Sequence, residues 1–73
     1  MSETPTPPEV GSLWEHESGE RRFVLAVWNS GLSETPMVRS HALYELDGEM
    51  RNAGLVERLA VWHAWAANAR RIA

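Results

Sequence analysis

The chain has 73 residues, of which 44% are hydrophobic and 23% charged, and its formal net charge is −3. A chain of this length forms one small domain, so a large catalytic cleft is not expected. The absence of cysteine excludes a disulfide framework and zinc sites built on thiolates. The acidic balance argues against the basic footprint of a nucleic-acid-binding protein. Four tryptophans are expected to supply much of the core.

The first nine residues contain three prolines, two glutamates and little that could be buried. This composition predicts a disordered tail over residues 1–9 and a single domain over residues 10–73. The segment has neither a basic start nor an apolar run, so it does not read as a signal peptide or a membrane anchor. We therefore expect a cytoplasmic protein that makes no membrane contact.

Residues 12–17 and 21–28 flank the turn former Ser18-Gly19, which predicts a β-hairpin. Both faces of the second strand are apolar, so it is expected at the centre of a sheet. Val24, Ala26 and Trp28 share one face, and Phe23, Leu25 and Val27 share the other. Trp14 and Trp28 are predicted to stack across this hairpin as part of the core.

Residues 29–36 read as a loop and residues 37–46 as a third strand, which ends at Asp47-Gly48. Beyond that turn the apolar period changes to about 3.6, which predicts a helix from Asn52 or Leu55 to the C-terminal arginines. Its apolar face is formed by Leu55, Leu59, Trp62, Ala66 and Ala69. The predicted fold class is α+β, a small three-stranded antiparallel sheet followed by a C-terminal helix.

Residues that could carry chemistry are widely separated. His16, His41 and His63 lie on different elements and form no metal-binding pair. No serine stands in a nucleophile motif, and no glycine-rich phosphate loop is present. We therefore expect no catalytic residues, no cofactor and no metal, and a protein that is not an enzyme.

Acidic residues cluster around the predicted hairpin and the loop that follows it. They read either as a solvated surface or as a patch that attracts a basic protein partner and speeds association. Trp65 lies off the main helix stripe and reads either as the rim of the core or as an interface anchor. The candidate partner-binding residues are thus Glu15, Glu17, Glu20, Glu34 and Trp65.

Two resemblances add to this reading. The pattern of Gly11, Trp14, His16 and Gly19, followed by Phe23-Val24-Leu25, Ser33-Glu34-Thr35 and Ala42-Leu43-Tyr44, resembles a small uncharacterised bacterial family. It covers about half of the chain and implies a compact β-rich module. The family supplies no activity, and the predicted helix departs from it.

The whole chain resembles the small RNA polymerase-binding transcription regulators of lytic Xanthomonas phages, in its Gly11-to-His16 opening and its Ala69-to-Ala73 ending. This resemblance implies a non-enzymatic phage protein that binds host RNA polymerase in the bacterial cytoplasm, and we expect the protein to be monomeric. It would inhibit initiation by interfering with the sigma-containing holoenzyme, shut off host transcription and act in antitermination. The alternative is a small β-rich adaptor that binds a peptide or nucleic acid through exposed aromatics.

Overall fold

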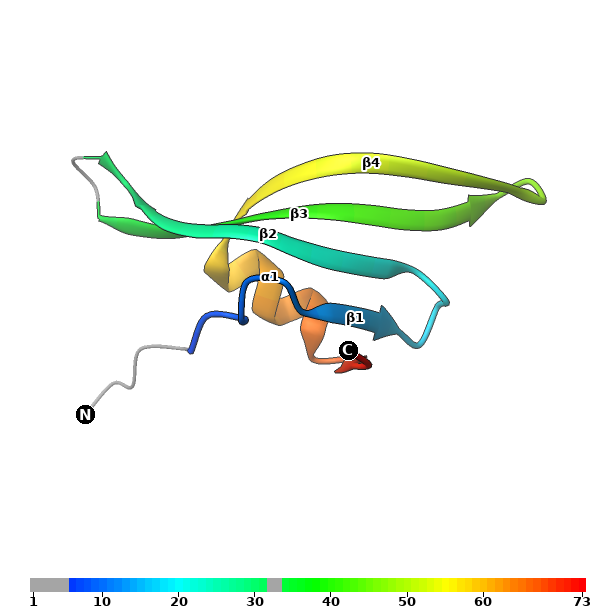
Figure 1. The fold of residues 1–73 in the computed structure, drawn as a ribbon, viewed down its shortest axis with the longest axis horizontal. Coiled ribbons are helices and arrows are strands. Elements are labelled where there is room, and N and C mark those ends of the chain that lie inside the picture. The colour runs from blue at the N-terminus through cyan, green and yellow to red at the C-terminus, as the bar shows by residue number, and fades with distance from the viewer. Residues whose placement is uncertain (1–5, 32–33) are drawn as a thin grey trace.

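The computed structural model describes residues 6–31 and 34–73 and shows one antiparallel sheet with a short helix (Figure 1). The five strands lie in the order β4-β3-β2-β1-β5. The elements, in chain order, are β1 (Leu13–His16), β2 (Arg21–Ser30), β3 (Thr35–Leu46), β4 (Glu49–Arg58), α1 (Leu59–Ala66) and β5 (Ala69–Arg71).

The prediction of a three-stranded sheet followed by a helix reaching the C-terminus is wrong. Residues 49–58 form strand β4, the helix begins only at Leu59, and Arg70 and Arg71 lie on or at the end of strand β5. Leu55, in strand β4, lies opposite the buried Ser40, on the same side of the sheet as the core that contains Leu59 and Trp62. The apolar residues at the end of strand β4 and in the helix that follows it therefore have the spacing expected of one continuous amphipathic helix.

The predicted hairpin of residues 12–17 and 21–28 is confirmed, whereas the second hairpin, formed by β3 and β4, was not predicted. β1 and β2 are joined through Gly19, whose φ of 95° favours glycine, and β2 lies at the centre of the sheet. Asp47 and Gly48 connect β3 to β4 with φ of 54° and 79°, the signature of a two-residue type I′ turn. The hairpin that this turn closes extends beyond the helix and gives the molecule its length (Figure 1).

The predicted core role of Trp28 is wrong. The β2–β3 register shifts between Val24 and Ala26, which marks a β-bulge. Beyond the bulge Val27 packs against the core, and Trp28 is left 38% exposed. The predicted stacking of Trp14 on Trp28 is also wrong, because Trp14 lies opposite Arg22 in the sheet and packs against Trp62.

The core lies between α1 and one face of the sheet, which we call the inner face. It centres on Val24, Val38, Leu59 and Trp62, each at most 2% exposed. The Trp14 and Trp62 rings meet edge to face, with centroids 5.9 Å apart. Since α1 contacts β1, β3, β4 and β5, the short helix spans the inner face and leaves the opposite face without a covering element in the described part of the chain.

The C-terminal residues Ile72 and Ala73 pair with the start of β1. The Leu13 amide donates to the Ala73 carbonyl at 3.0 Å, and the Ile72 amide donates to the Leu13 carbonyl at 2.8 Å. Of the predicted tail, residues 1–5 lie outside the described residues, whereas Pro8 is buried. No helix within residues 6–31 and 34–73 is long and apolar enough to cross a membrane.

Candidate interaction surface

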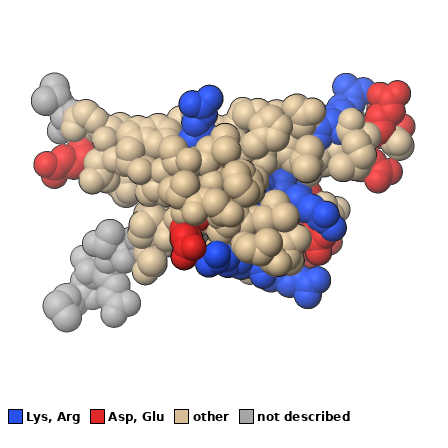
Figure 2. Space-filling view, in the orientation of Figure 1, with Lys and Arg blue, Asp and Glu red and all other residues tan. Residues whose placement is uncertain are grey.

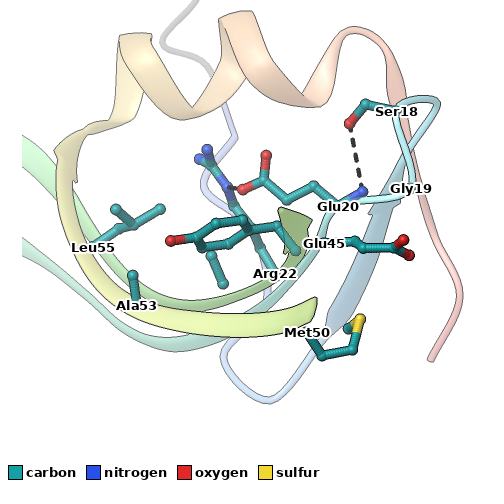
Figure 3. A pocket seen from close by; sticks show the side chains of 10 residues that line it. Ser18, Gly19, Glu20, Arg22, Glu45, Met50, Ala53 and Leu55 are labelled. Atoms are coloured by element: carbon teal, nitrogen blue, oxygen red, sulfur yellow. Dashed lines mark hydrogen bonds and ion pairs between the residues drawn. The ribbon is translucent and has the colours of Figure 1, made fainter. Parts of the chain in front are cut away.

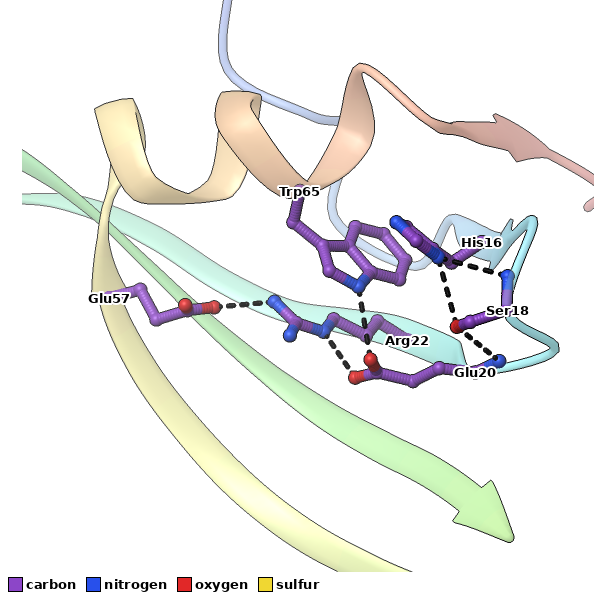
Figure 4. Close-up of polar contacts among 6 residues, drawn as sticks. All are labelled: His16, Ser18, Glu20, Arg22, Glu57 and Trp65. Atoms are coloured by element: carbon purple, nitrogen blue, oxygen red, sulfur yellow. Dashed lines mark hydrogen bonds and ion pairs between the residues drawn. The ribbon is translucent and has the colours of Figure 1, made fainter.

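A buried arginine organises the inner face beside α1 (Figure 4). The Arg22 side chain, 10% exposed, donates from Nε to Glu20 Oε2 and from Nη1 to Glu57 Oε1, both at 2.7 Å. Its Cζ lies 4.3 Å from the centre of the Trp65 ring. Two carboxylates and a ring thus balance a desolvated cation, and the cluster ties β2, β4 and α1 together.

Trp65, a candidate partner-binding residue, makes several intramolecular contacts. Its Nε1 donates to Glu20 Oε1 at 3.1 Å, and its ring stacks on His16 with centroids 5.3 Å apart. It also contacts Trp62, with centroids 5.2 Å apart. The side chain lies at the rim of the core, half-buried, which is the first of the two readings that the sequence left open.

His16 and Ser18 form a local pair within the β1–β2 turn. Ser18 Oγ lies 2.9 Å from His16 Nδ1, and the Ser18 amide also donates to Nδ1 at 3.0 Å (Figure 4). A hydrolase needs a carboxylate to orient the base and donors to receive an oxyanion. Neither accompanies this pair in the described contacts, so the geometry is that of a turn stabilised by its own side chains.

The candidate carboxylates divide into two groups. Glu15 pairs with Arg21 at 3.0 Å and with Arg70 at 3.5 Å, while Glu20 belongs to the Arg22 cluster. Glu17 and Glu34 are exposed. Glu34 has a φ of 49° and follows β2, at the end opposite the turn that holds Glu17. The sheet therefore places three of the acidic residues near the β1–β2 turn and keeps Glu34 apart from them.

A groove lies on the inner face where the β3–β4 hairpin extends past α1 (Figure 3). Its volume is about 560 Å³, and its lining includes Arg22, Ala42, Tyr44, Ala53 and Leu55. Arg22, the buried charged residue in this lining, is already paired with the carboxylates of Glu20 and Glu57. No group of three or more potential metal ligands occurs in the described residues. The groove is an open, mostly apolar hollow rather than an assembled chemical site.

The opposite face of the sheet, which we call the outer face, carries large apolar side chains with no helix over them. The inward direction of Val24, Val38 and Ala42 fixes which neighbours point outward, because strand residues alternate. Four of the apolar residues on this face are each 41–59% exposed: Phe23, Leu25, Leu43 and Val56. The sequence showed both apolar faces of β2, but it did not show that only one would be covered.

Two arginines on the same face have no ion-pair partner among the described residues. Five arginines form ion pairs with glutamates among the described residues, whereas Arg39 and Arg58 form none. Arg39 lies opposite Val56 in the sheet, and Arg58 lies opposite Met37, all on the outer face. In Figure 2 one basic side chain stands at the upper margin of the molecule, while other acidic and basic side chains lie at its ends and along its lower side. This face therefore combines exposed apolar area with uncompensated positive charge.

Comparison with known proteins adds no identification. No family model, no curated protein and no solved structure matches this chain.

Proposed function

We propose that this protein is a non-enzymatic binding module that acts by covering a surface of another protein. The observation that carries the proposal is the outer face, where Phe23, Leu25, Leu43 and Val56 are exposed around Arg39. Several large apolar side chains exposed on one uncovered sheet face are a feature of protein interaction sites. A standard interface needs about 800 Å² from each partner, and a broad sheet face is the surface best suited to supply it.

The partner that we propose is bacterial RNA polymerase, and the proposed effect is inhibition of initiation through interference with the sigma-containing holoenzyme. This part rests on the resemblance of the whole chain to phage transcription regulators. The unpaired Arg39 and Arg58 add a physical condition. The docking site on the polymerase should be apolar and should carry acidic groups opposite Arg39 and Arg58, because the two cations are then neutralised on binding.

The test is binding of the purified protein to bacterial core enzyme and holoenzyme, together with promoter-dependent transcription. Val56→Glu places a charge on the outer face at edge strand β4, where the native side chain is 59% exposed. We expect a loss of affinity of about tenfold or more, equivalent to ~1.4 kcal/mol. The matched control is Val61→Glu on α1, where the valine is 48% exposed and lies away from this face.

Equal binding by the two variants, with both folded by circular dichroism, would remove the outer face from the proposal. If the native protein neither binds polymerase nor affects transcription, the proposal that polymerase is the partner is wrong.

The adaptor alternative is distinguished by the dependence of binding affinity on salt concentration. Direct contact with nucleic acid predicts affinity that falls steeply as salt is raised, whereas docking on an apolar protein surface depends on salt only weakly.

A further inference from the structure

We propose that two copies of this chain pair edge to edge through β4, which gives a continuous sheet with five strands from each copy. The proposal is independent of the polymerase and of the outer face. It starts from the difference in length between the two edge strands of the sheet. β5 has three residues, whereas β4 has ten and its pairing with β3 shows no bulge. An unprotected long edge is a template for another strand.

The outward backbone groups of β4 follow from the turn before it. Leu46 and Glu49 flank the two-residue turn and form the hydrogen-bonded pair that closes the hairpin. Odd-numbered residues of β4 therefore direct their amide and carbonyl groups at β3. The outward groups belong to the even-numbered residues, and no backbone hydrogen bond outside the β3 ladder is recorded for them among the described residues: Met50, Asn52, Gly54, Val56 and Arg58.

The side chains of β4 select one register with a second copy. With the two-fold axis at Gly54, Asn52 lies opposite Val56 of the second copy, and their outward groups pair. Arg51 then lies opposite Glu57 of the second copy, and the two-fold axis repeats this ion pair. Opposite charges placed directly across an antiparallel pair stabilise it. Both side chains lie on the inner face, because the odd-numbered residues of β4 lie opposite inner-face residues of β3: Arg51 opposite Tyr44 and Glu57 opposite Val38.

The charged partners are available for this contact. Glu57 accepts Arg22 through Oε1, and no partner is recorded for Oε2 within the described structure. Among the residues that the structure describes, Arg51 pairs with Glu49 alone, at 3.4 Å, and the two side chains are 47% and 74% exposed. Such a surface pair contributes little and gives way easily.

Neighbouring registers are less favourable. Moving the axis to Ala53 sets Glu49 opposite Glu57 of the second copy, which places like charges together. Moving it to Leu55 sets Arg51 opposite Leu59, where the strand has ended and the helix begins. Only the register centred on Gly54 aligns the strands over residues 50–58 with complementary charges. This complementarity is why a second copy, rather than an unrelated extended peptide, is the occupant that we assign.

The dimer is tested with single cysteines, because the native chain has none. Gly54→Cys places the two thiols beside the axis, in a pair whose Cα separation of about 5.5 Å permits a disulfide. Nothing lies within 4 Å of a Cβ at Gly54 in the single chain, so the variant should fold. The matched control is Asn52→Cys, whose two copies would lie roughly 14 Å apart.

We expect rapid formation of a disulfide-linked dimer by Gly54→Cys under mild oxidation, and at least tenfold slower linkage of Asn52→Cys. Sedimentation of the native chain over a concentration series should approach the mass of two chains. Val56→Pro removes an outward amide that is not used by β3, so it should shift this equilibrium to the monomer, while Val56→Thr should not. A native chain that stays monomeric at all concentrations, equal linkage of both cysteine variants, or growth into larger oligomers would overturn the proposal.

Discussion

Arg22 lies with its guanidinium carbon 4.3 Å from the centre of the Trp65 ring and with both carboxylates of Glu20 and Glu57 in contact. This arrangement joins the centre of the sheet to the last turn of the helix. It also explains why an arginine is tolerated with a side chain only 10% exposed in so small a domain. The same contacts make the residue sensitive to substitution.

Arg22→Ala is expected to lower the free energy of unfolding by about 3 kcal/mol or more, because two partly buried carboxylates lose their cation. Urea denaturation followed by tryptophan fluorescence measures the change. Arg51→Ala is the matched control, since its pair with Glu49 is exposed and should contribute less than ~1 kcal/mol. Equal losses in the two variants would contradict the structural role of the cluster.

The tryptophans should differ sharply in their contribution to stability. Trp62 is 1% exposed at the centre of the core, so Trp62→Ala should cost about 3–5 kcal/mol and unfold much of the population. Trp28 is 38% exposed, so Trp28→Ala should cost about 1 kcal/mol. Thermal unfolding of both variants makes the comparison. A Trp28→Ala protein that fails to fold would restore the core role that the sequence suggested.

The β3–β4 turn should depend on glycine at one position only. Gly48 has a φ of 79°, so Gly48→Ala should destabilise the protein by about 1–2 kcal/mol through backbone strain. Gly54→Ala is the control, because that position has no positive φ and open space for a Cβ. It should leave the stability of the single chain unchanged within ~0.5 kcal/mol or increase it. The measurement is chemical denaturation at a protein concentration low enough to exclude self-association.

The acidic candidates can now be tested separately. Glu17→Lys should leave the fold intact, because the native side chain is exposed and has no recorded ion pair in the described structure. Glu20→Lys should destabilise the protein by ~3 kcal/mol, because it sets a second cation against Arg22. If the acidic patch guides a basic partner, Glu17→Lys slows association at low salt without changing stability. An unchanged association rate would remove Glu17 from the partner-binding set.

The sequence predicts the first half of the fold well and the second half poorly, for identifiable reasons. The apolar run of β2 and the turn formers at Gly19 and Gly48 carry strong local signals. β4 lacks such a signal, because Asn52 and Gly54 disfavour a strand and Leu55 happens to continue the spacing of Leu59 and Trp62. Its strand conformation comes from pairing with β3, which is a tertiary effect.

The outer face could not be predicted as the candidate surface from the sequence, for a related reason. The exposure of Phe23 and Leu25 depends on how much of the sheet the helix covers, and a helix of eight residues covers one face only. The bulge beside Leu25 then turned Trp28 away from the face on which strict alternation would place it. Neither the extent of helix coverage nor the bulge can be predicted from the hydropathy pattern, because a regular strand and a bulged strand fit the same pattern.

The pairing of β5 with β1 sets an order of assembly. β2, β3 and β4 are joined by short connections, so their ladders form between neighbours in the chain. The hydrogen bonds between Leu13 and Ile72 join nearly opposite ends of the chain and require α1 to be in place first. Contacts so distant in sequence are slow to form. We therefore expect this closing pair to be the last to form during folding, and its amides to exchange with solvent before those of β3.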